Sequence, residues 1–94
     1  MPAYKLTPRP ERLADPRWRE RTRLRQRCWV QAPSENAARY FVAGATMSAN
    51  KYPPTYHPEP SPWQDSEFTD CIEEDRPGGN PTGHQILTDD GDFV

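Results

Sequence analysis

One strand-helix unit, residues 26–44, constrains the fold of this 94-residue chain more than any other feature. Residues 26–32 have the composition of a strand and run into Pro33-Ser34. Ser34 is a favourable helix N-cap, Glu35 suits the positive end of a helix, and Gly44 is placed to stop one. We therefore expect a strand over residues 26–32, followed directly by a helix over residues 34–43.

Apolar residues on the predicted helix recur with the spacing i, i+3, i+4 and i+7, which is typical of a helix with one buried stripe. The stripe consists of Ala38, Phe41, Val42 and Ala45, and the opposite side carries Glu35, Asn36 and Arg39. Side chains alternate along a strand, so Cys28, Val30 and Ala32 share one face and Trp29 takes the other. We expect the first face to meet the helix. A single helix leaves the face with Trp29 to be covered by a proline connector, a second copy or a partner.

The supply of large aliphatic and Phe side chains is small for a folded chain. Leu, Ile, Val and Phe together number 12 of 94 residues, a proportion below the level at which composition starts to suggest disorder. Three Trp, four Tyr and a net charge of only −2 argue against complete disorder, because aromatic side chains bury large areas. We expect one domain over residues 1–75 and a flexible acidic tail over residues 76–94.

Two further segments have the pattern of strands, and a third is rich in proline. Residues 4–7 alternate apolar and polar side chains before Pro8 and Pro10, which is typical of an edge strand. Residues 66–73 predict the last strand. Residues 51–63 contain five prolines and predict an extended connector. The fold class is therefore α+β: a small antiparallel sheet of about three strands with one helix on one face.

Charge is distributed unevenly along the chain. Residues 1–27 carry nine basic and three acidic side chains, a net charge of +6, whereas residues 28–94 carry three basic and eleven acidic ones, a net charge of −8. This asymmetry is typical of a nucleic-acid-binding face beside an acidic tail. It is equally typical of two halves that attract each other within the fold or between copies.

An Arg-rich arm covers residues 9–27, and arginines occupy every second position of it from residue 17 to residue 27, with two tryptophans close to them. In an extended chain these arginines would project from one face. Guanidinium groups bind phosphates or carboxylates, and indoles stack on bases. The candidate interaction residues are Arg17, Trp18, Arg19, Arg21, Arg23, Arg25, Arg27 and Trp29.

The sequence contains no pattern that predicts catalysis, a cofactor or a metal site. The possible zinc ligands are Cys28, His57, Cys71 and His84, and each is more than ten residues from the next, whereas structural zinc sites use ligand pairs a few residues apart. Neither histidine has a nucleophile or a partner acid at a recognisable spacing. We expect a chain that is not an enzyme.

The chain has too few cysteines for a secreted disulfide scaffold, and it shows no leader and no long apolar run. We therefore expect a soluble, cytoplasmic protein without a membrane span. The preference for Arg over Lys, ten to two, is typical of GC-rich bacterial genomes. The first hypothesis is a non-catalytic interaction or regulatory module that binds another protein or itself. The alternative is a nucleic-acid-binding protein that uses the arginines at 17–27.

Overall fold

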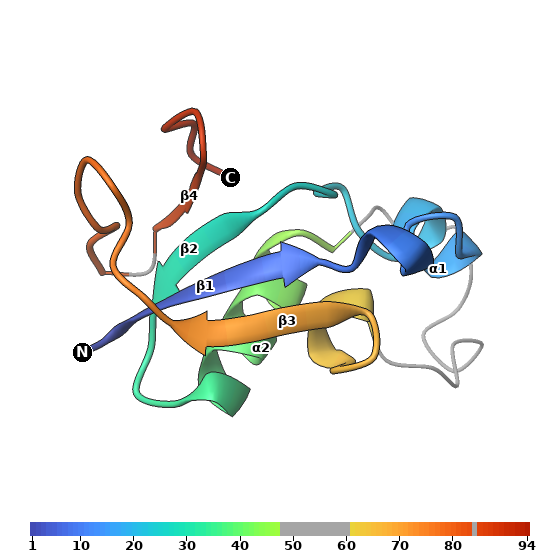
Figure 1. Cartoon of the computed structure of the whole chain (residues 1–94), viewed down its shortest axis with the longest axis horizontal. Coiled ribbons are helices and arrows are strands. Elements are labelled where there is room, and N and C mark those ends of the chain that lie inside the picture. The colour runs from blue at the N-terminus through green and yellow to red at the C-terminus, as the bar shows by residue number, and fades with distance from the viewer. Residues whose placement is uncertain (48–60, 84) are drawn as a thin grey trace.

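The structure is a computed structural model that describes residues 1–47, 61–83 and 85–94. It contains an antiparallel sheet of four strands in the order β3-β1-β2-β4, and α2 lies across one face of it (Figure 1). The strands are β1 (Ala3–Pro8), β2 (Cys28–Gln31), β3 (Thr69–Glu73) and β4 (Ile86–Thr88). The helices are α1 (Pro16–Glu20), α2 (Glu35–Ala45) and the 3-10 turns η1 (Pro10–Arg12) and η3 (Pro62–Gln64). The predicted α+β class is confirmed, with four strands in place of three.

The predicted helix is confirmed as α2, and its start follows from the sequence. The Ser34 side chain accepts a hydrogen bond from the Ala37 amide at 3.2 Å, which satisfies one of the free N–H groups of the first turn. The helix passes through Gly44 and ends at Ala45, so the expected end at residue 43 is wrong by two residues. Thr46 donates its hydroxyl to the Val42 carbonyl at 2.7 Å at this end.

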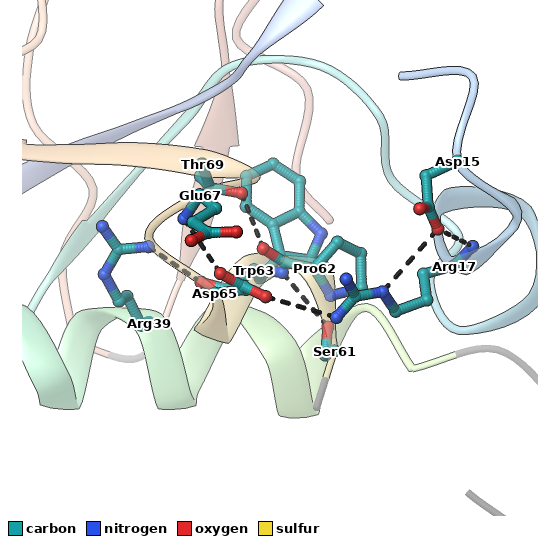
Figure 2. A network of polar contacts seen from close by, with 9 residues as sticks. All are labelled: Asp15, Arg17, Arg39, Ser61, Pro62, Trp63, Asp65, Glu67 and Thr69. Carbon is teal, nitrogen blue, oxygen red and sulfur yellow. Dashed lines mark hydrogen bonds and ion pairs between the residues drawn. The ribbon is translucent and has the colours of Figure 1, made fainter. Parts of the chain in front are cut away.

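The core lies between α2 and the sheet face that carries Cys28, Val30 and Ala32, all fully buried as predicted. Two members of the predicted pattern lie elsewhere. Ala45 is exposed, whereas Arg39, placed on the solvent side by the pattern, is buried. Arg39 pairs with Glu35 and donates to the Trp63 carbonyl of η3 at 3.4 Å, because η3 covers this flank of the helix (Figure 2).

β1 is a central strand between β3 and β2, so the expectation that residues 4–7 form an edge is wrong. Pro8 suggested an edge strand, but the direction of the backbone N–H groups makes it compatible with a central one. The backbone N–H groups of even-numbered β1 residues point toward β2, and the pairing with β2 ends at Leu6 and Cys28. Pro8 lies beyond that pairing and faces Thr69 of β3, so its missing N–H removes no ladder hydrogen bond.

The fourth strand comes from residues 76–94, which the composition predicted to be a flexible tail. β4 pairs with β2, with Leu87 opposite Trp29 and Ile86 opposite Val30, and Ile86 is buried. After β4 the chain turns at Gly91, where φ is +82°, and returns along the outer side of the strand. The predicted connector falls mostly on residues 51–60, which lie outside the described residues, and its end forms η3. In the described ranges no helix is long and apolar enough to cross a membrane.

Candidate interaction surface

The Arg-rich arm does not form one extended strand, so its alternating arginines do not share one face. Asp15 accepts a hydrogen bond from the Arg17 amide at 2.9 Å and starts α1, which contains Arg17 and Arg19. Between α1 and β2, the one strand-type pairing found within the described residues is an isolated bridge between Thr22 and Met47. The strand predicted over residues 26–32 begins at Cys28, and the arm leads into it as irregular chain.

Arg17 is used inside the fold. Its guanidinium lies 3.3 Å from an Asp65 carboxylate oxygen (Figure 2). The same guanidinium lies 3.8 Å from the centre of the Phe68 ring. Asp65 also accepts a hydrogen bond from the Glu67 amide, so it shapes the turn that leads into β3. Arg17 therefore joins α1 to the start of β3.

Arg23 and Arg27 also have partners within the chain. Arg23 donates from its guanidinium to the Ala45 carbonyl at 2.7 Å, where a positive charge favourably meets the negative end of α2. Arg27 donates to both carboxylate oxygens of Asp89 at 3.0 Å and lies 5.6 Å from the centre of the Trp29 ring. These two arginines therefore join the arm to α2 and to the chain after β4.

Of the six alternating arginines at 17–27, Arg19, Arg21 and Arg25 have no such role among the described residues. Arg19 and Arg25 are exposed and Arg21 is partly exposed. Within residues 1–47, 61–83 and 85–94, none of the three forms an ion pair or donates a side-chain hydrogen bond. Three of the six alternating arginines therefore have no ion pair or side-chain hydrogen bond among the described residues.

Both candidate tryptophans are buried. Trp18 is completely covered and meets Trp63 edge to face, with the ring centres 5.2 Å apart. Trp29 lies on the sheet face opposite α2, as predicted, but it is only 3% exposed because Arg27 and Arg76 lie over its ring. That face is therefore covered at Trp29 by the chain itself, and neither indole presents a free ring to a base.

A hollow of about 160 Å³ lies beside Trp29 and is lined by charged side chains. Lys5 pairs with Glu74 at 2.7 Å and Arg27 pairs with Asp89. Arg76 donates to the main-chain carbonyl of Thr88 at the end of β4 at 3.2 Å, and to those of Gly79 before the strand and Asp89 after it. The charges of this hollow thus bind one another and hold the chain around β4 onto the sheet.

The two cysteines flank Leu6 on neighbouring strands, since Cys28 and Cys71 both pair with that residue. Two strand spacings, about 9.5 Å, separate them, which is too far for a disulfide. Burial raises the pKa of the Cys71 thiol to about 11 and raises that of Cys28 further. Both thiols are therefore protonated at neutral pH. The described residues hold no group of three or more His, Cys, Asp or Glu side chains placed to bind a metal; His57 and His84 lie outside them.

The outer edge of β4 is closed by the chain itself. The Thr88 amide donates to the Asp92 carbonyl at 3.0 Å, and the Val94 amide donates to the Ile86 carbonyl at 3.0 Å. A bridge joins Leu87 to Phe93. Of the backbone groups of β4 that point away from β2, the Thr88 amide and the carbonyls of Ile86 and Thr88 are thus paired.

The outer edge of β3 is open, as its register with β1 shows. The Glu74 amide donates to the Ala3 carbonyl and the Arg9 amide donates to the Phe68 carbonyl, so even-numbered β3 residues bond to β1. The N–H and C=O groups of Cys71 and Glu73 therefore point away from the sheet. In the part of the chain that the structure describes, no hydrogen bond reaches these groups.

Carboxylates and one apolar side chain border the open edge of β3. On the face away from α2, the side chains of Asp70 and Glu74 are 57% and 44% exposed, and Ile72, which lies between them, is 48% exposed. Glu73 is exposed on the α2 side. The edge thus combines free main-chain groups with a negative border.

Sequence reasoning missed this edge, because strand order decides which strand is at the rim and the patterns do not contain strand order. One signal for the fourth strand was present. Asp90-Gly91, between apolar pairs at 86–87 and 93–94, is typical of a hairpin turn. Comparisons with protein-family models, with curated proteins and with solved structures gave no match.

Proposed function

We propose that this chain is a non-catalytic protein-interaction module that binds an extended segment of another protein along β3. The unpaired main-chain groups of Cys71 and Glu73 carry this proposal. Exposed edges pair readily with other strands, and natural proteins usually protect them. Here the described residues close the β4 edge and leave the β3 edge open. Strand addition at such an edge is a common way to bind peptides.

The chemistry around the sheet supports a binding role over a catalytic one. Protonated, buried thiols are poor nucleophiles and poor metal ligands. The charged side chains beside Trp29 are paired with each other or with carbonyls. Among the described residues, the groups with unused hydrogen-bonding capacity at the surface include the β3 edge and the arginines at 19, 21 and 25.

The experiment compares two substitutions at Glu73. Glu73→Pro removes the outward N–H and leaves the hydrogen bonds between β3 and β1 in place, whereas Glu73→Gln keeps the N–H. Heptapeptides selected from a random displayed library on the wild-type protein should lose binding to the Pro variant and retain it with the Gln variant. Thermal unfolding controls for folding of both variants. Selected peptides that bind the Pro variant as tightly as the wild type would contradict the proposal.

Nucleic-acid binding is a second candidate function, favoured by the unpaired arginines at 19, 21 and 25. The burial of Trp18 and Trp29 removes the stacking surfaces that single-strand binding usually employs, so phosphate contacts would supply the affinity. Three contacts give a slope of log K against log salt of about −2 to −3. Titration with single- and double-stranded oligonucleotides at low and physiological salt tests this function. Binding that stays weak at low salt would exclude it.

A further inference from the structure

We infer that the segment that binds β3 carries basic side chains at positions i and i+4 and an apolar side chain at i+2. This inference rests on the proposed function and specifies its partner. Asp70, Ile72 and Glu74 lie on the same side of the sheet at every second position, in the order carboxylate, apolar, carboxylate. A strand added beside them places its own alternate side chains directly opposite these three.

The carboxylates already have cations on one side. Arg9 lies 2.8 Å from Asp70 and Lys5 lies 2.7 Å from Glu74, both from β1. The opposite side of each carboxylate faces the position of the missing strand. Each carboxylate has two oxygens with about four acceptor sites, so it can bind a second cation there. Basic residues on the added strand would give each carboxylate a second cation, in addition to the one that reaches it diagonally from β1.

The central position favours an apolar side chain. Ile72 is 48% exposed, although its neighbours on β1 and β2 at the same level are Lys5 and Trp29. An apolar residue opposite Ile72 would bury surface that no other side chain of the described sheet covers. The side chains that border the β3 edge thus favour a binding segment with basic residues at i and i+4 and an apolar residue at i+2.

A second copy of the chain fits this edge poorly. A closed two-fold dimer would pair β3 with β3 in the antiparallel direction. If Ile72 were opposite Ile72 of the second copy, Asp70 would face Glu74 of that copy, and like charges directly opposite are destabilising. With Cys71 opposite its own copy, Ile72 would face Asp70. If the two-fold axis passed beside Glu73, the Glu73 carboxylates of the two copies would face each other. A basic strand from another protein avoids all three mismatches.

Three synthetic heptapeptides test the inference. The first, Thr-Arg-Thr-Val-Thr-Arg-Thr, has the inferred spacing; the second has the same composition with one arginine moved by one position; the third has Glu in place of Arg. Titrations at low salt follow the amide signals of Cys71 and Glu73 by NMR. The acidic peptide reverses the sign of both charge pairs, so its affinity should be about tenfold or more below that of the first peptide. The affinity of the shifted peptide should lie between those of the first and third peptides.

The double variant Asp70→Asn/Glu74→Gln is the matched control, and it should bind the basic and acidic peptides with nearly equal affinity. Equal binding of all three peptides to the wild type, with both amides engaged, would overturn this inference and leave strand addition intact. Peptides that never engage the two amides would overturn the proposed function as well. Concentration-dependent dimers that the double variant strengthens would identify a second copy as the occupant.

Discussion

At the scale of single residues, a buried hydrogen bond from Trp63 to Thr22 joins η3 to the Arg-rich arm. The Trp63 indole N–H donates to the Thr22 hydroxyl at 2.9 Å, and both side chains are buried. Thr22→Val keeps the shape and leaves the indole N–H without an acceptor, so we expect a loss of about 1–3 kcal/mol in the free energy of unfolding. Urea denaturation measures it. Thr22→Ser should lose less, and a Val variant as stable as the wild type would contradict this role.

The Cys71 thiol predicts a dependence of stability on alkaline pH. Burial raises its pKa from the ordinary value of 9.0 to about 11, so the folded state holds the proton more tightly than the unfolded chain. The contribution of this thiol to the free energy of unfolding is fully present below pH 9 and is lost as the pH rises from 9 toward 11. Urea midpoints should be flat below pH 9 and fall above it. Cys71→Ala should reduce the fall; an unchanged pH profile would contradict the assignment.

At the scale of elements, α2 shows which features sequence can predict. Its start depends on Ser34 and the next few residues, so the prediction succeeded. Its end and its buried side depend on Thr46, Arg23 and η3, which are distant or outside the helical pattern, so the stop at Gly44 and the exposure of Arg39 were predicted wrongly. Ser34→Ala should cost about 1 kcal/mol of stability in urea denaturation. A loss below a few tenths would mean that the cap is dispensable.

β4 was the largest error, because its acidic composition concealed a short hairpin that becomes stable only against β2. Gly91 makes the turn with φ at +82°, a conformation that costs L-residues about 1–2 kcal/mol. Gly91→Ala should destabilise the protein by about that amount and accelerate amide exchange at Thr88, whose hydrogen bond to Asp92 closes the hairpin. Gly91→Asn, which tolerates this conformation better, is the matched control. Equal stability of the Ala variant would contradict the argument.

At the scale of the whole molecule, the two oppositely charged parts of the chain meet within the fold. Lys5, Arg9, Arg17 and Arg27 pair with Glu74, Asp70, Asp65 and Asp89 respectively. Attraction within the fold was one of the alternatives that the charge pattern left open, and these pairs are its physical form. The sequence showed the imbalance but could not say which arginines stay free, because that depends on where the distant carboxylates lie after folding.

Residue-by-residue amide hydrogen exchange tests the open β3 edge most directly. In the free protein, we expect alternating protection along β3, with slow exchange at Asp70 and Ile72 and fast exchange at Cys71 and Glu73, while Thr88 of the closed β4 edge stays slow. Adding the basic heptapeptide should slow exchange at Cys71 and Glu73. Cys71 and Glu73 amides as slow as Ile72 in the free monomer would show that the edge is already covered, and would contradict the proposed function.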